Sequence, residues 1–374
     1  MERLSERDGT DLDDPLRLQR QLRKELPPEQ AAAVAEQLVL RRRAASRFGP
    51  PFSEWLWSSE LLEMASHPLV ARRRAERFAR LGLPVVDGTV GAGVDLWALR
   101  AANGLAWGVE RNPLAAYLAA RNVGGVIRGD ICRAPVALPR VALFLDPARR
   151  RDGARVVRHE RYEPPLASVI ELLQRAAAGA AKLAPGIDWR ELAPTFEIEV
   201  VQLGRSLREL AIWSGAGATP RLRRAVLIDA GAELSSEEPA AAMAPGPLGG
   251  ILYDPEPAVT RAGLVAQLAH RLGARPLEAG GAYLSADHLA ETPLARAFAV
   301  LEVLPFSLSR LRATLRARGW RLGEVLRRHF PLTPEELRRL VGPLQGESVT
   351  VICTRVDGRP VVVVAQPVSG RRGR

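Results

Sequence analysis

Residues 85–95 read VVDGTVGAGVD, and this stretch decides the fold that we predict. A short apolar strand runs directly into a loop that holds Gly88, Gly91 and Gly93, and a helical pattern follows. Glycine lets the backbone approach a ligand closely, and a helix N-terminus offers free N–H groups. Such a loop is therefore typical of the nucleotide-binding crevice of an open α/β sheet. A tight structural turn can need the same glycines, so the loop alone is a weak signal.

Strand and helix patterns alternate downstream of this loop. GLAWGVE, VGGVIRGD and VALFLDPARR read as strands, and DLWALRAAN and PLAAYLAARN read as helices between them. Alternation at this spacing predicts a parallel sheet covered by helices, which is an α/β fold of the Rossmann-like kind. AAKLAPGID, FEIEVVQLG and RRAVLIDAG read as later strands of the same fold.

The composition divides the chain into four predicted parts. Apolar residues at helical spacing precede the loop, and we expect one helical run over residues 58–82 whose five arginines form a solvated face. Residues 233–249 are rich in Pro, Gly, Ala and Ser and read as a linker, and residues 259–273 read as one helix. The parts are an N-terminal helical region (1–80), a Rossmann-like cofactor-binding domain (81–245), a connecting segment (246–296) and a small α+β domain (297–370) that ends in a hairpin with Asp357-Gly358 at its turn.

Details of the glycine loop separate two classes of cofactor. A dinucleotide fingerprint reads G-x-G-x-x-G, but counting from Gly91 the place of the third glycine is taken by Leu96. Asp87 and Asp95 stand where a pyrophosphate would lie, and carboxylates there suit a cationic ligand. The loop therefore favours S-adenosylmethionine, with its amino group and sulfonium, over a dinucleotide oxidoreductase.

Two further acids follow the next two strands. Glu110 ends the second strand, where a carboxylate can accept hydrogen bonds from both ribose hydroxyls, a feature that NAD enzymes share. Asp130 follows the third strand and could accept a hydrogen bond from the exocyclic amine of adenine. Taken on its own, Asp130 could equally be a solvated residue of the loop. Three acids in order at three successive strand ends are much less likely to occur by chance than any one of them alone. The predicted cofactor-binding residues are Asp87, Gly88, Gly91, Gly93, Asp95, Glu110 and Asp130.

The fourth strand, VALFL, ends in DPARR at residues 146–150. Proline fixes the loop, so the Asp and the carbonyls after it have defined directions beside the methyl donor. A plain Asp-Pro strand terminator is the alternative. We predict Asp146, Pro147 and Arg149 as catalytic residues, with Asp146 as the acceptor for the target group and Arg149 as a clamp for a flanking phosphate.

Together these motifs carry a family resemblance. The order DGTVGAGVD, VERNPLAAYLAARN, GD and DPARR resembles the class I S-adenosylmethionine-dependent methyltransferases, and within them a bacterial DPARR-motif group with a THUMP-like C-terminal domain. ASHPLVARRRAERFARLG resembles the helical lead-in of that group, and RAFAVLEVLPFSLSRLRATLRARG resembles the start of its terminal domain, so nearly the whole chain is covered. The resemblance implies a methyltransferase fold and RNA, such as tRNA or rRNA, as substrate.

One departure from better-understood relatives lies after the fourth strand. Methyltransferases that act on amino groups carry (D/N)-P-P-(Y/F) there, and the aromatic residue stacks on the target base. This chain has Asp146-Pro147-Ala148-Arg149, and Tyr162 is the nearest aromatic candidate. The target atom therefore stays open. A non-catalytic RNA-binding or assembly protein on a methyltransferase scaffold is the alternative function.

The charge of the chain is basic and uneven. Lys24 and Lys182 are the only lysines, so 51 of the 53 basic residues are arginine, which a GC-rich genome would also produce. Residues 301–374 hold 14 Arg and 6 acids, which gives +8 of the total formal charge of +11. Guanidinium groups suit phosphate, so this terminal region is the predicted RNA-binding part.

Other classes of protein are disfavoured. No stretch approaches the roughly 20 apolar residues that span a bilayer, and the first residues, MERLSERDGTDLDD, lack the apolar core of a secretory signal. Only Cys132 and Cys353 are present, and the five histidines are scattered, so we expect neither a disulfide framework nor a metal. A reducing, cytoplasmic location is the default expectation.

Overall fold

The computed structural model describes residues 15–148, 150–151, 154–155, 162–242, 244–278, 280–328, 330–356 and 358–368. The chain forms two compact units. The first comprises Met1–Ile187 and Ala211–Pro220, and the second comprises Asp188–Leu210 and Arg221–Arg374. Among the described residues no helix is both long and apolar enough to cross a membrane.

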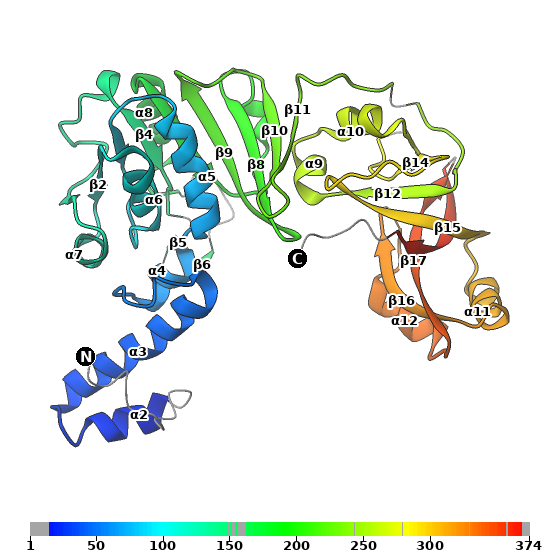
Figure 1. Cartoon of the computed structure of the whole chain (residues 1–374), viewed down its shortest axis with the longest axis horizontal. Helices are drawn as coiled ribbons and strands as arrows, with labels where there is room; N and C mark the ends of the chain where they lie inside the picture. The colour runs from blue at the N-terminus through cyan, green and yellow to red at the C-terminus, as the bar shows by residue number, and fades with distance from the viewer. Residues whose placement is uncertain are drawn as a thin grey trace. The chain divides into compact units, whose positions relative to one another are not determined.

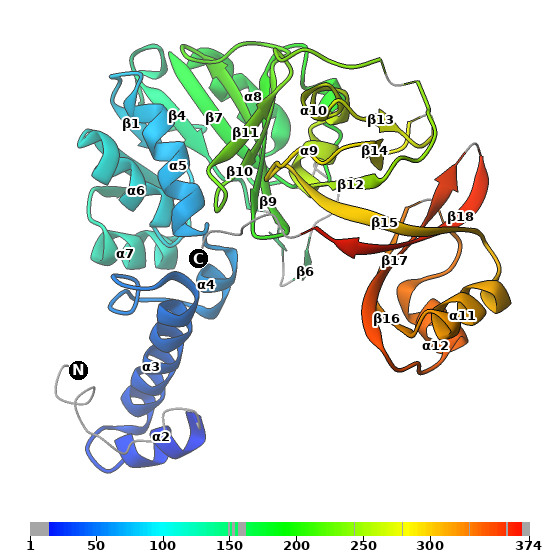
Figure 2. The same cartoon turned by 45° about the vertical axis from the view of Figure 1, so that its right-hand side comes forward.

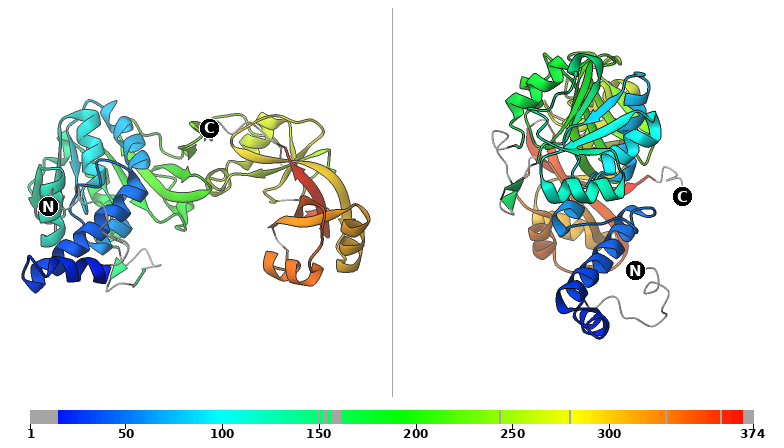
Figure 3. Two further views of the ribbon diagram at one scale, coloured as in Figure 1. Left: turned by 60° about the horizontal axis from the view of Figure 1, so that its bottom comes forward. Right: turned by 90° about the vertical axis from the view of Figure 1, so that its left-hand side faces the viewer.

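The first unit begins with helices. They are α2 (Pro15–Leu22), α3 (Pro28–Phe48), α4 (Ser59–Met64) and α5 (Pro68–Ala79). Helix α2 folds back on α3 around a small apolar cluster that includes Leu18 and Ala31 (Figure 3). The predicted single helix over residues 58–82 is wrong: it is divided at Pro68, which lacks the N–H that would continue a helix and instead starts α5.

Five parallel strands form the centre of the first unit (Figure 1). Their order is β7-β4-β1-β2-β3. Their bounds are β1 Val85–Asp87, β2 Ala106–Glu110, β3 Val126–Arg128, β4 Ala142–Leu145 and β7 Ala178–Leu183. Strands β1, β4 and β7 are buried along their whole length, which explains their continuous apolar runs. This is the predicted parallel Rossmann-like sheet.

Helices connect these strands on both faces of the sheet. Helices α6 (Val94–Asn103) and α7 (Pro113–Asn122) link β1 to β2 and β2 to β3 in one direction, whereas α8 (Leu166–Arg175) links β4 to β7 in the other. Right-handed crossovers then require α8 to cover the opposite face, as Figure 2 shows. Shorter elements of this unit are the 3-10 turn η1 (Leu138–Arg140), β5 (Arg150–Arg151) and β6 (Ala154–Arg155).

The second unit begins with the 3-10 turn η3 (Trp189–Glu191). Its next strands are β8 (Glu197–Leu203), the first half of β9 (Ser206–Gly215), β10 (Arg223–Leu227) and β11 (Ala232–Ser235). The second half of β9 belongs to the first unit, where β9 follows β7 in the strand order. Strand β10 pairs with β8 in parallel and with β11 antiparallel. The predicted linker therefore begins too early, because residues 233–235 are part of β11.

A seven-stranded sheet forms the rest of the second unit, in the order β13-β14-β12-β15-β18-β17-β16. Its strands are β12 Ile251–Pro255, β13 Arg275–Pro276, β14 Leu284–Ala286, β15 Ala295–Pro305, β16 Trp320–Arg327, β17 Glu347–Val356 and β18 Arg359–Pro367. Helices α11 (Leu308–Ala317) and α12 (Pro334–Val341) pack against β16 and against each other. The predicted hairpin is β17–β18, and Asp357 of its turn lies outside the described residues.

Two short helices replace the single helix predicted over residues 259–273. They are α9 (Pro257–Arg261) and α10 (Val265–Leu272). Gly263 lies between them with a φ of 67°, a left-handed conformation that a regular helix cannot contain. Gly263 therefore lies in the turn that separates α9 from α10.

Candidate active site

The glycine loop joins β1 to α6 and needs its glycines. Gly91 and Gly93 have φ values of 56° and 97°, where other residues are strained. A Cβ at Gly88 would lie 2.6 Å from the Leu145 side chain and 2.7 Å from that of Ile131, so only glycine fits there without a shift. The loop predicted from the sequence is therefore held by both backbone conformation and packing.

Asp87 lies at the end of β1 and is completely buried. Its Oδ1 accepts a hydrogen bond of 3.1 Å from the Thr89 N–H. Its Oδ2 is buried and has no hydrogen-bond partner among the residues that the structure describes. Burial raises the pKa of Asp87 well above its ordinary value, and the nearby charge of Asp95 raises this pKa further. A buried carboxylate oxygen without a hydrogen-bond partner can accept a hydrogen bond from a bound ligand, for example from an amine.

Glu110 ties the end of β2 to the glycine loop. Its Oε2 accepts from the Gly91 N–H at 2.9 Å, and its Oε1 accepts from the Asn112 N–H at 2.7 Å. The side chain is half-buried, and each carboxylate oxygen has a second lone pair for a ligand. Glu110 thus sets the position of Gly91 and keeps acceptor capacity for hydroxyl groups.

The two remaining predicted acids have different surroundings. Asp130 is half-buried, and its Oδ1 accepts from the Cys132 N–H at 3.0 Å, which fixes the loop after β3. Asp95 is buried and forms an ion pair with Arg74 of α5. Arg74 also lies over the Phe144 ring, 4.3 Å from its centroid. The expectation that the α5 arginines form a solvated face is therefore wrong for Arg74, which is only 3% exposed.

Asp146 follows β4 and is held from two sides. Its backbone N–H donates to Thr89 Oγ1 at 2.6 Å, which joins it to the glycine loop. Its Oδ2 accepts from Lys182 Nζ at 2.6 Å, and the same Nζ donates to Ser66 Oγ at 3.0 Å. The Lys182 side chain is 5% exposed, whereas that of Asp146 is 21% exposed. The carboxylate therefore stands at the edge of the site on a buried cationic support.

Sequence reasoning missed Lys182 and its partner Ser66. Lys182 lies within the buried strand β7, and Ser66 lies between α4 and α5, so only the tertiary fold brings them to Asp146. A signal was present, because a buried apolar strand holds one of only two lysines in a chain with 51 arginines. A charge at such a position needs a partner.

The rest of the predicted catalytic loop is only partly described. Pro147 is buried, and Ala148 pairs with Glu163 through two backbone hydrogen bonds of 2.9 and 3.2 Å. Arg149 lies outside the described residues. Tyr162, the candidate for base stacking, is 3% exposed, and its hydroxyl accepts from the Ala184 N–H at 3.3 Å. In this conformation its ring is not available to a base.

Negative charge predominates at this edge of the sheet. The carboxylates of Asp95, Asp146 and Glu110 all lie near enough to Asp87 to raise its pKa. Among the described residues, Arg74 and Lys182 are the cations paired with two members of this group. Three carboxylates besides the buried Asp87, against two paired cations, favour a ligand that carries positive charge.

Comparison with known proteins agrees with this chemistry. The chain is 35% identical over 341 residues to uncharacterized S-adenosylmethionine-dependent methyltransferases of two strains of Mycobacterium tuberculosis, CDC 1551 / Oshkosh and H37Rv, with 88% of this chain and 94% of the relative covered. The chain belongs to the S-adenosylmethionine-dependent methyltransferases. Its cofactor is thus S-adenosylmethionine, and the orphaned Asp87 oxygen and the excess of carboxylates fit the cationic groups of that molecule.

Two further comparisons match nearly the whole chain and its C-terminal domain, respectively. A crystal structure of a Porphyromonas gingivalis W83 protein assigned as a methyltransferase superposes with a TM-score of 0.77 at 26% identity, and it covers 96% of this chain and 99% of that one. The family described as THUMP domain-like matches residues 295–367. The predicted fold, a Rossmann-like methyltransferase with a THUMP-like terminal domain, is confirmed.

Proposed function

We propose that this methyltransferase modifies RNA, with the methyl donor held in the first unit and RNA held in the second. The observation that carries the RNA substrate is the basic surface of the THUMP domain-like region. Helix α11 exposes Arg310, Arg312 and Arg316, and residues 301–374 have a net charge of +8. Guanidinium groups bind phosphate bidentately, so this surface is suited to a polyanion.

The donor is held by the loop between β1 and α6 and by the acids at the strand ends. Asp87 Oδ2 accepts from a donor of the cofactor, while Gly88, Gly91 and Gly93 let the backbone approach it. Glu110 and Asp130 accept from the ribose and the adenine. Asp95 acts through the loop instead, because its carboxylate is paired with Arg74.

The nucleophile is oriented by the loop that follows β4. When bound, S-adenosylmethionine supplies a methyl group that its positive sulfur makes electrophilic. Asp146 accepts a hydrogen bond from the target group, and Lys182 and Thr89 fix the direction of Asp146. Pro147 sets the backbone of this loop, and we expect Arg149 to contact a phosphate beside the target. Positioning of this kind can supply several kcal/mol of the barrier, on the order of 7–11 kcal/mol at most.

Transfer of labelled methyl groups tests this function. RNA from a strain that lacks the protein is incubated with labelled S-adenosylmethionine and wild-type protein, Asp146→Asn, or Glu171→Gln. Glu171 is an exposed acid of α8 outside the site and serves as the matched control. We expect incorporation by the wild type and the control and a loss of orders of magnitude in Asp146→Asn. Cofactor binding without transfer to any RNA would instead support the non-catalytic RNA-binding alternative.

A further inference from the structure

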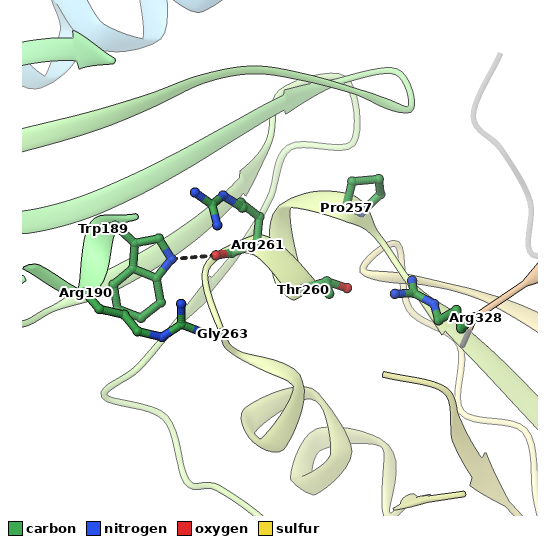
Figure 4. Close-up of a pocket in the computed structure, with 7 residues that line it drawn as sticks. All are labelled: Trp189, Arg190, Pro257, Thr260, Arg261, Gly263 and Arg328. Atoms are coloured by element: carbon green, nitrogen blue, oxygen red, sulfur yellow. Dashed lines mark hydrogen bonds between the residues drawn. The ribbon is translucent and has the colours of Figure 1, made fainter. Parts of the chain in front are cut away.

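A second cluster of functional side chains lines a pocket of about 420 Å³ in the second unit. Figure 4 shows its lining, in which Arg190 and Arg261 lie near the Trp189 ring and Arg328 approaches from the other end. Three arginines and no acid belong to the described lining, which consists of Trp189, Arg190, Pro257, Thr260, Arg261, Gly263 and Arg328.

The fold builds this pocket from the η3 turn and the turn between α9 and α10. The Trp189 indole N–H donates to the Arg261 carbonyl at 2.8 Å, which joins the two turns. Arg223 Nη1 donates to the carbonyls of Ala262 at 2.9 Å and Gly263 at 2.8 Å. A Cβ at Gly263 would lie 2.8 Å from the Arg223 guanidinium and 3.3 Å from the Trp189 ring, so the turn needs glycine. The pocket wall is therefore tied together by hydrogen bonds and close packing.

Positive charges are crowded around the Trp189 ring. The guanidinium carbons of Arg190 and Arg223 each lie 5.3 Å from its centroid. Burial lowers the pKa of Arg223, and the charge of Arg190 lowers it further. Burial also lowers the pKa of Arg261, where Asp188 opposes the shift and Arg190 adds to it. The positive charge of Arg190 thus acts unfavourably on both neighbouring arginines, and an anion in the pocket would relieve that repulsion.

Two of the lining arginines also contact carboxylates. Asp188 pairs with Arg190 at 3.3 Å, but both side chains are more than half exposed, so the pair is weak. Asp254 accepts a hydrogen bond of 2.9 Å from Arg328, and this ion pair neutralises the charge of Arg328. The Arg328 side chain therefore serves mainly as the wall at the far end of the pocket. Thr260 Oγ1 is buried and has no hydrogen-bond partner among the described residues, so the lining also holds a polar atom without a partner.

We propose that this pocket binds a phosphate group of the RNA backbone, an inference that rests on RNA being the substrate. Arginine presents its N–H donors in a planar fork that matches the oxygens of phosphate, so several guanidinium groups around one pocket suit this anion. A nucleobase does not fit the same site, because Trp189 is only 8% exposed and arginines lie over its ring. The pocket places an RNA contact outside helix α11.

RNA binding at several salt concentrations tests the pocket. Fluorescence anisotropy with labelled single-stranded RNA compares the full-length wild type with a double variant, Arg190→Ala with Arg261→Ala. A control variant, Arg121→Ala with Arg140→Ala, removes the same charge from exposed positions of the first unit. We expect the pocket variant to bind roughly tenfold more weakly, with a salt slope smaller by about 0.7, since the one phosphate held in the pocket releases about 0.7 counterion on a single strand.

A further variant and a stability measurement show why RNA affinity is lost. Arg190→Lys keeps the charge and should keep most of the salt slope, and thermal melting of every variant shows whether the fold survives. If the pocket variant binds RNA as tightly as the control variant does, the pocket proposal is overturned while the RNA substrate stands. If the wild type binds no RNA at any salt concentration, the RNA substrate and the pocket proposal both fail.

Discussion

The active-site edge of the first unit and the arginine pocket of the second unit are opposite in charge. At the first, three carboxylates lie near the buried Asp87, and each of the two cations there is paired with one of these three. At the second, guanidinium groups gather around Trp189, and Asp188 is a weak, exposed partner. This difference supports the proposal that the chain separates its two ligands by charge, with a cationic cofactor at the first site and a polyanionic substrate at the second.

The largest expected effect comes from removing the support of Asp146. Lys182→Met leaves a carboxylate beside a buried apolar side chain, and turnover should fall by about 10²-fold or more because the loop loses its geometry. The loss of stability should stay below the roughly 3–5 kcal/mol of a fully buried pair, since the Asp146 side chain is 21% exposed. Single-turnover rates at saturating cofactor measure the first effect, and urea unfolding measures the second.

A rescue experiment distinguishes positioning from simple packing at Lys182. Lys182→Arg keeps the charge in a larger side chain and should recover part of the turnover that Lys182→Met loses. If Lys182→Met and wild type turn over at the same rate, Asp146 does not depend on this ion pair, and the acidic site needs no internal cation.

Gly88→Ala should damage the cofactor site by overpacking. The new methyl group would meet Leu145 and Ile131 at 2.6 and 2.7 Å, which costs about 1–3 kcal/mol when the core must shift. We expect a lower melting temperature and weaker cofactor binding. Gly186→Ala is the matched control, because Gly186 also lacks a positive φ but has open space around its Cβ position, and this change should leave both properties nearly unaltered.

Glu110→Ala should weaken cofactor binding by about 1–3 kcal/mol, the scale of charged hydrogen bonds left unmade. The structure adds a second cause, because Gly91 loses the acceptor that fixes its N–H. Isothermal titration calorimetry with S-adenosylmethionine gives the affinity directly. An unchanged dissociation constant would remove Glu110 from the cofactor site.

The affinity for the cofactor should depend on pH through Asp87. Because burial raises the pKa of this carboxyl in the folded protein, it stays protonated above the ordinary Asp range. Cofactor affinity should therefore rise as the pH increases through the raised pKa, while the stability of the cofactor-free protein falls over the same interval. Binding and melting curves across pH check both signs, and Asp87→Asn should flatten both dependences.

The smallest effect is expected on α11. Replacing Arg310, Arg312 and Arg316 one at a time by Ala should weaken RNA binding by a few-fold each and reduce the salt slope by about 0.7 each. Anisotropy titrations measure both. A loss of affinity without a change of slope would indicate that these side chains act through the fold of the domain and not through phosphate.

Local signals explain how much of this molecule could be predicted from its sequence. Gly91 and Gly93 were found because a turn at positive φ restricts the residue type at that position, whatever lies around it. Strands β1 and β4 of the parallel sheet were found because their burial leaves short continuous apolar runs. The breaks at Pro68 and Gly263 were missed, although both residues are visible in the sequence, because apolar spacing on either side of them continues the helical pattern.

Contacts between distant segments could not be predicted in the same way. Arg74 belongs to a run of arginines that reads as a solvated face, and only the packing of α5 on α6 brings it to Asp95. Lys182 reaches Asp146 and Ser66 from a strand that has no polar neighbour in sequence within β7. The arginine pocket joins residues 189–190, 257–263 and 328, and no periodicity relates such segments.

The proposed separation of the two ligands by charge is tested most directly by measuring the affinity of two variants for both ligands. S-adenosylmethionine and RNA are titrated into Asp87→Asn and into Arg190→Ala with Arg261→Ala. We expect Asp87→Asn to lose cofactor affinity and keep RNA affinity, and the double arginine variant to do the reverse. Equal losses of both ligands in either variant, or cofactor affinity unchanged in Asp87→Asn, would contradict the assignment of a cationic ligand to one site and a polyanion to the other.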